Sequence, residues 1–234
     1  MIRYLSLALG ALVCGFLGAW LFALSGLGDR NTEAYLLDHP EILPKMAEKL
    51  QSNETARRLA GVEGEVDRPF PGAVLGNPQG TRTLVEFTDY GCTFCRQSIA
   101  DVQALIAADP QLRVVVREWP IFQGSDDAAR MALAAANQGK YAEFHDLMFA
   151  HGPPSPASIE RAAKGAGLDM AAAKAFAASP AVELELRTNH ELARKLGFDG
   201  TPSWVIGSQA FSGAVGRAQL ADAIETAAGG NEGA

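Results

Sequence analysis

The chain opens with a long hydrophobic run. Residues 4–27 contain no charged side chain, and Arg3 precedes them. A run of this length is able to span a bilayer, whereas the small residues Ala23 and Ser25 fit the cleavage site of an exported protein. Residues 1–28 are therefore predicted to be a signal peptide or a membrane anchor, and both alternatives stay open at this point.

Apolar residues at helical intervals follow within residues 29–62. The spacing predicts an amphipathic helical extension, with a helix over residues 32–59 that accommodates Pro40 in a first turn. The apolar face consists of Leu36, Leu37, Leu43, Met46 and Leu50. Because an isolated amphipathic helix needs a partner surface, it either packs on its own domain, lies on a membrane or mediates self-association.

The pattern changes to strand-like runs after a linker at residues 61–80, which is rich in Gly and Pro. Residues 83–88 (Thr-Leu-Val-Glu-Phe-Thr) and 113–117 (Arg-Val-Val-Val-Arg) are predicted strands, and a helix over residues 92–108 lies between them. A strand, a helix and a strand in this order predict parallel pairing of the two strands.

The remaining pattern places a helical block inside the same domain. Residues 125–196 are Ala-rich and are broken by Gly and Pro into about five predicted helices. Strand character returns at residues 203–207 and 209–211, a predicted hairpin, before a final helix over residues 217–227. The prediction is an α/β fold whose main domain, residues 63–228, contains an inserted helical subdomain.

Composition narrows the function classes. The chain has 234 residues, 48% of them hydrophobic, which suits one well-buried domain with appendages. Its 20 basic and 27 acidic residues are interspersed and give a net charge of -7, which disfavours nucleic-acid binding. Of the three cysteines, Cys14 lies in the apolar run and is interpreted as an ordinary apolar residue of a membrane or signal segment. One cysteine pair is therefore left that is able to carry chemistry.

That pair is Cys92-Thr93-Phe94-Cys95, at the predicted start of a helix. Residues three apart lie on one turn, close enough for a disulfide that is easily made and broken. Unpaired N–H groups and the positive end of the helix dipole favour the Cys92 thiolate, so Cys92 is the expected nucleophile and Cys95 the resolving cysteine. A structural disulfide or half of a metal site are the alternatives, although no second ligand motif is present.

Glu86 lies six residues before Cys92 in an otherwise apolar strand. In that position it is a candidate buried acid beneath the cysteine helix, where it would relay the proton of Cys95. The alternative interpretation is a glutamate at a sheet edge or on the surface.

Two segments carry a family resemblance. Residues 85–95 (Val-Glu-Phe-Thr-Asp-Tyr-Gly-Cys-Thr-Phe-Cys) and 200–206 (Gly-Thr-Pro-Ser-Trp-Val-Ile) resemble the DsbA family of thiol-disulfide oxidoreductases. The resemblance covers about residues 65–228, with its pieces in the expected order. Residues 34–43 resemble an N-terminal extension found in a subset of that family. The resemblance implies a thioredoxin-like fold, redox chemistry without an organic cofactor or metal, and self-association through residues 33–59.

The resemblance also assigns roles to residues far from the cysteines. It implies that Pro202 is a cis proline facing the cysteine pair and that the backbone of Thr201 pairs with an extended substrate chain. Taken alone, this dipeptide would indicate only a turn before a strand. Arg117 resembles a basic residue placed near the buried acid, although a solvated arginine is the commoner case.

The spacer between the cysteines departs from the family. The strongest oxidants have Pro-His there, whereas this chain has Thr93-Phe94, so no spacer histidine stabilises the reduced thiolate. The pair is therefore expected to be less oxidising. In isomerase-like and reductase-like members of the family, the residue before the proline is more often Thr than Val, and this chain resembles them in having Thr201 there.

Together these features predict an exported thiol-disulfide oxidoreductase in the periplasm or cell envelope, held in the inner membrane if residues 4–27 are an anchor. Its expected partners are cysteine-containing exported client proteins and a membrane redox partner that resets the pair. Isomerase or reductase activity is one alternative. A chaperone-like client-binding or metal-binding protein is the other.

Overall fold

The computed structural model describes residues 2–24, 27–62 and 64–230. The chain divides into two compact units, Met1–Ser52 and Asn53–Ala234, and each is described by itself. Part of the predicted signal cleavage site, at residues 25–26, lies outside the described residues.

Helices make up the first unit. They are α1 (Ile2–Leu24), α2 (Leu27–Asp38) and the beginning of α3 (Ile42–Ala60). The single helix predicted over residues 32–59 is wrong, because the chain turns between α2 and α3. Pro40 lies in this turn, where it has no N–H to continue a helix and disfavours helical backbone at His39.

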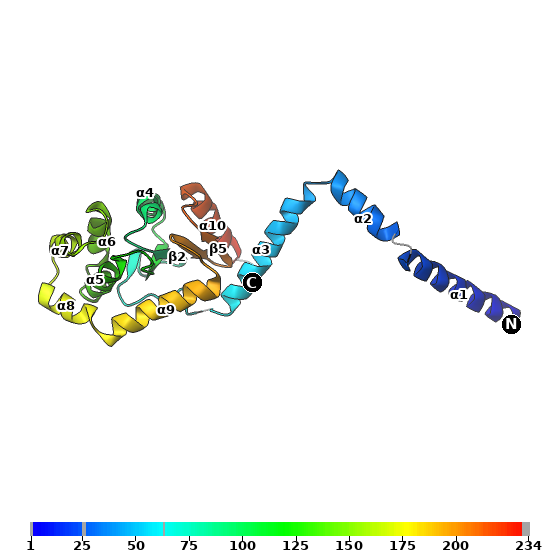
Figure 1. The fold of residues 1–234 in the computed structure, drawn as a ribbon, viewed down its shortest axis with the longest axis horizontal. Coiled ribbons are helices and arrows are strands. Elements are labelled where there is room, and N and C mark those ends of the chain that lie inside the picture. The colour runs from blue at the N-terminus through cyan, green and yellow to red at the C-terminus, as the bar shows by residue number, and fades with distance from the viewer. Residues whose placement is uncertain (1, 25–26, 63, 231–234) are drawn as a thin grey trace. The chain divides into compact units, whose positions relative to one another are not determined.

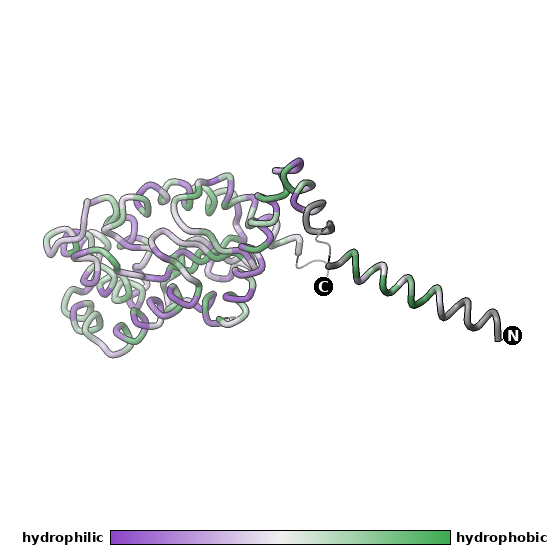
Figure 2. The backbone as a smooth tube through the Cα atoms, turned by 45° about the vertical axis from the view of Figure 1, so that its right-hand side comes forward, coloured by the Kyte–Doolittle hydropathy of each residue, from purple (hydrophilic) through white to green (hydrophobic). Residues whose placement is uncertain are grey.

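The N-terminal helix carries the hydrophobic run. Figure 2 colours the described part of the α1 backbone mainly green, the colour of hydrophobic residues. Among the described residues, however, no helix meets the combined length and hydropathy of a membrane span. The predicted anchor over residues 4–27 includes residues 25–26, which lie outside the described residues, and it stays a prediction.

A five-stranded sheet forms the centre of the second unit, with the order β1-β3-β2-β4-β5. β2 and β3 are parallel, as the sequence predicts, whereas β1 and the β4–β5 hairpin pair antiparallel with their neighbours. The strands are β1 (Val74–Gly76), β2 (Arg82–Thr88), β3 (Leu112–Glu118), β4 (Ser203–Ile206) and β5 (Gln209–Ser212).

Helices cover both faces of this sheet (Figure 1). α4 (Thr93–Ala108) and α10 (Arg217–Gly230) share a core with Leu84 and Val116 on one face. On the opposite face, the end of α3 and α9 pack against Val85, Phe87 and Val115. Strand residues therefore alternate between two buried faces, which explains their nearly continuous hydrophobicity.

The Ala-rich segment folds into helices with clear sequence boundaries: α5 (Ser125–Asn137), α6 (Tyr141–Ala150), α7 (Pro156–Gly165), α8 (Met170–Ala177) and α9 (Pro180–Leu196). Ser155, Asp169 and Ser179 cap three of them through their side chains, and Gly197 ends α9 with positive φ. The molecule thus has the predicted thioredoxin-like α/β architecture together with added helices.

Candidate active site

The two cysteines lie at the beginning of α4. Cys92 is the N-cap residue, and its Sγ accepts a hydrogen bond from the backbone N–H of Cys95 at 3.4 Å. Both cysteines are free thiols; Cys92 is 3% exposed and Cys95 is fully buried. A sulfur at a helix N-terminus faces N–H groups that stabilise negative charge, so the geometry suits Cys92 as the attacking thiolate.

The Thr201–Pro202 segment faces the cysteine pair. Its peptide bond is cis, and the Cys92 thiol donates a hydrogen bond to the Thr201 carbonyl at 3.1 Å. The following residue, Ser203, pairs with Phe87 in the sheet, which places this segment next to the strand that leads into the cysteines. The structure therefore brings together two parts of the chain that are 109 residues apart.

Glu86 is buried beneath α4. In the sheet it pairs with Val116, and alternation puts it on the face that α4 covers. Burial raises the pKa of Glu86 from 4.5 to about 8, opposed by the Thr88 hydroxyl. Burial is also the main cause that raises the pKa of Cys95 well above its usual value, and the charge of Glu86 raises it further. The two groups are thus close enough to influence each other's protonation.

Asp89 organises the approach to the cysteines, a feature that the sequence analysis missed. Its carboxylate accepts hydrogen bonds from the backbone N–H groups of Gly91 (2.6 Å), Ile121 (2.6 Å) and Phe122 (2.9 Å) and from the Ser125 hydroxyl. These bonds join the turn before α4 to the loop after β3. The position of Asp89, directly after the buried strand β2, is the sequence signal for this role.

A second buried acid, Glu118, was also missed. It ends β3 and accepts hydrogen bonds from the hydroxyls of Tyr90 (2.9 Å) and Tyr141 (2.7 Å). Burial raises its pKa to about 8, against the effect of both hydrogen bonds. Because β3 also contains Arg113 and Arg117, an acid at the end of this strand does not stand out in the sequence as Glu86 does.

Arg117 does not lie near the buried acid. It pairs with Phe87 in the sheet, on the face opposite to Glu86. Its guanidinium forms an ion pair with Glu185 at 3.0 Å and donates to the Val66 carbonyl. The predicted proximity to Glu86 is therefore wrong, and Arg117 instead holds the loop before β1 against α9.

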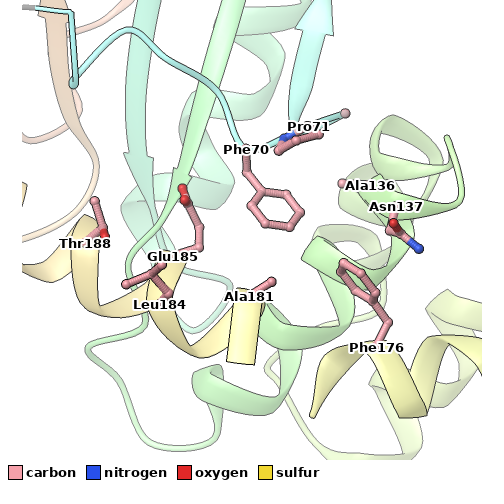
Figure 3. A pocket seen from close by; sticks show the side chains of 10 residues that line it. Phe70, Pro71, Ala136, Asn137, Phe176, Ala181, Leu184, Glu185 and Thr188 are labelled. Atoms are coloured by element: carbon pink, nitrogen blue, oxygen red, sulfur yellow. The ribbon is translucent and has the colours of Figure 1, made fainter. Parts of the chain in front are cut away.

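A pocket of about 670 Å³ lies between the loop at Phe70 and α5, α8 and α9 (Figure 3), but none of its lining residues is a predicted site residue. Its acid, Glu185, pairs with Arg117. Within the part of the chain that the structure describes, no group of three or more His, Cys, Asp or Glu residues is placed to hold a metal ion. Cys14 is exposed in α1.

A CxxC pair capping a helix, a cis proline facing it and a buried acid below it form the arrangement expected of a thiol-disulfide redox site on a thioredoxin-like fold. The sequence model described as the DSBA-like thioredoxin domain matches residues 83–225. The chain belongs to this family, and its fold is that of an oxidoreductase.

Solved structures similar to this chain include thioredoxin-like and thiol-disulfide exchange proteins. The chain is 45% identical to a thioredoxin-like oxidoreductase from Silicibacter pomeroyi, covering 66% of this chain and 90% of that one with a TM-score of 0.63. It is 26% identical to the thiol-disulfide exchange protein alpha-DsbA2 from Wolbachia pipientis (76% and 97% covered, TM-score 0.68). It is also 26% identical to a periplasmic thioredoxin-like protein from Salmonella enterica (73% and 95% covered, TM-score 0.59).

The curated relatives are longer proteins. A Na(+)/H(+) antiporter NhaA from Salinispora arenicola is 28% identical over 80% of this chain, but the match covers 30% of the antiporter. The chain thus spans less than a third of that relative's length.

Proposed function

We propose that the chain is an exported thiol-disulfide oxidoreductase that forms or rearranges disulfides in client proteins through Cys92 and Cys95. The observation that carries this proposal is the position of the Cys92 sulfur, at the N-terminus of α4 and 3.1 Å from the Thr201 carbonyl. The periplasmic protein among the similar structures and the apolar N-terminal run support export.

In the oxidising direction, a client thiolate attacks the sulfur of Cys92 in the Cys92–Cys95 disulfide. A client–Cys92 bond forms, the bond between the cysteines breaks, and Cys95 leaves as a thiolate that takes a proton from Glu86. A second client thiolate then attacks the mixed disulfide and releases Cys92. The client thus gives two electrons to the cysteine pair, which is left with Cys95 as a thiol and Cys92 as a thiolate, while the two client protons pass to the solvent, from which Glu86 is reprotonated. A disulfide-bearing membrane partner then reoxidises the pair.

The surface around Cys92 suits unfolded clients. Phe94, Ile121 and Phe122 are 58%, 40% and 48% exposed, and they flank the cysteine from α4 and from the loop that Asp89 holds. Apolar side chains bind extended, unfolded segments without requiring a particular sequence. We propose that the Thr201 backbone, whose carbonyl lies next to the sulfur, pairs with such a segment.

The test compares the purified chain with Cys92→Ala in insulin reduction and in recovery of scrambled ribonuclease. We expect both activities to fall to the uncatalysed level in the variant. Wild-type activity no higher than that of Cys92→Ala would favour a chaperone-like or metal-binding protein instead. The reduction potential of the pair, measured against glutathione, separates an oxidase from an isomerase or reductase, because a strong oxidase requires a high potential.

We also propose that residues 33–59 mediate self-association. Large apolar side chains in this segment are more than two-fifths exposed, which is unusual for a soluble helical surface without a partner: Tyr35, Leu36, Leu37, Leu43, Met46 and Leu50.

A further inference from the structure

Four buried polar side chains lie near the cysteine pair but take no part in the thiol exchange described above. Glu118 is two residues beyond Val116 in β3, so it lies on the same sheet face as Glu86. Its Oε1 accepts from the hydroxyls of Tyr90 and Tyr141, and the Tyr90 hydroxyl is 3.1 Å from Nδ1 of His145. None of the four side chains is more than 2% exposed, so bulk water does not screen their charges.

The directions of these hydrogen bonds follow from the groups themselves. Since the Tyr90 hydroxyl donates its proton to Glu118, its oxygen accepts from His145, which assigns the imidazole proton to Nδ1. Oε2 of Glu118 and Nε2 of His145 then have no partner among the described residues. Buried polar atoms without partners reduce stability, and they therefore point to a functional reason for keeping the acid.

The charged surroundings of Glu118 are mainly acidic. Asp89 and Glu86 both raise its pKa by their negative charge, in addition to burial. His145 is neutral, because burial lowers its pKa to about 3. Arg117, the neighbour of Glu118 along β3, points to the opposite face and pairs with Glu185. Glu118 and Glu86 therefore titrate in the same pH range without a cation between them on this face of the described sheet.

We propose that Glu118 is a positioning residue for the redox reaction: it holds a proton beside Tyr90, and its ionisation opposes that of Glu86, thereby setting the pH at which Glu86 accepts the proton of Cys95. The inference rests on the proposed redox function. Its physical basis is that two like charges in a low-dielectric interior cannot both form easily. Tyr90 connects the acid to the turn that carries Cys92.

The substitution Glu118→Gln isolates the effect of the Glu118 charge on the ionisation of Glu86. The amide has the shape of the protonated acid, its oxygen still accepts from both tyrosines, and it never becomes charged. Glu143→Gln is the matched control, because it removes the same charge from the exposed surface of α6, the helix that contributes Tyr141 and His145.

The experiment follows the carboxyl carbons of ¹³C-labelled glutamate by NMR as a function of pH in the reduced full chain, assigning Glu86 by its loss in Glu86→Gln. In Glu118→Gln we expect the midpoint of Glu86 to move to lower pH by about half a unit or more. The pH profile of the Cys95-dependent step should move in the same direction. In Glu143→Gln, the Glu86 midpoint and the pH profile should both stay where they are in wild type. An unchanged Glu86 midpoint in folded Glu118→Gln overturns the proposal.

Tyr141→Phe provides a second test if Glu118→Gln does not fold. It removes one hydrogen bond that favours the ionised acid, so Glu118 should titrate at higher pH and Glu86 at lower pH. A shift of Glu118 without any response of Glu86 would contradict the coupling. Because the titration is measured without a substrate, a chain lacking redox activity would still report it, which separates failure of this inference from failure of the proposed function.

Discussion

Glu86 is the residue at which function and stability are expected to oppose each other. Its pKa is raised from 4.5 to about 8, so the folded chain holds a proton that the unfolded chain releases above pH 4.5. Stability is therefore lost as the pH rises from about 4.5 to about 8, and the loss levels off above that range. Glu86→Gln should be more stable than wild type at pH 8, by on the order of a few kcal/mol, and nearly equal to it at pH 4. Urea denaturation at a series of pH values measures this difference in the free energy of unfolding.

The same substitution should slow the Cys95 step, because proton transfer to and from Cys95 then lacks its partner. We expect a loss of about tenfold or more in the rate at which the mixed disulfide is resolved, measured by stopped-flow fluorescence. Glu143→Gln, an exposed acid on α6, serves as the control for both measurements. A variant with wild-type resolution kinetics would show that Glu86 has no relay role.

Sequence alone predicted those site residues whose spacing is distinctive. The cysteine pair and the Thr201–Pro202 dipeptide are local motifs, and Glu86 stands out as an acid within an apolar strand. The interpretation of Arg117 was wrong because alternation along β3 turns it to the other face. Glu118 was missed because its partners Tyr141 and His145 come from α6, and only the tertiary fold brings that helix to the end of β3.

At the scale of elements, Asp89 links the turn before α4 to the loop between β3 and α5. The two segments lie so close that a Cβ at Gly91 would be 2.9 Å from Cβ of Phe122. In Asp89→Asn, an NH₂ group replaces one oxygen and faces donors. We expect a loss of about 1.5 to 3 kcal/mol in the free energy of unfolding, the range for hydrogen bonds to a charged group. Chemical denaturation measures it.

The loosened loop should also affect clients selectively. Because Ile121 and Phe122 flank the cysteine, KM for insulin should rise in Asp89→Asn, whereas the rate with dithiothreitol should change little. Asp126→Asn is the matched control, since that acid is exposed near the same loop and its ion pair is an i,i+4 pair with Arg130. Equal losses with both substrates would place the defect in the cysteines rather than in the loop.

Helices and strands were predicted from the sequence where a local pattern of residues marks them. The strands β2 and β3 and the hairpin were predicted from hydrophobic runs, and the helices after Ser125 from Gly and Pro breaks. β1 was not predicted, because three residues, Val74–Gly76, are too short for a pattern and are held by pairing with β3. The turn at Pro40 was missed because the apolar spacing continues across it.

At the scale of the whole molecule, the exposed apolar residues of α2 and α3 predict an oligomer that carries several active sites. Leu43→Ser combined with Leu50→Ser removes two side chains that are 73% and 62% exposed, so it should weaken association without creating a cavity. Sedimentation velocity should show an oligomer for wild type and a smaller species for the double variant. Leu184→Ser, at a residue 58% exposed in the second unit, should leave the oligomer intact.

Association has a consequence for the direction of the chemistry. Several cysteine pairs held together can attack one misfolded client repeatedly, which favours rearrangement of disulfides, whereas simple reduction needs one pair. The double variant Leu43→Ser and Leu50→Ser should therefore lose more activity in recovery of scrambled ribonuclease than in insulin reduction, measured at equal active-site concentration. If both activities persist unchanged in a dissociated variant, the N-terminal helices do not contribute to isomerisation. If wild type itself sediments as a monomer, the exposed apolar face has another partner.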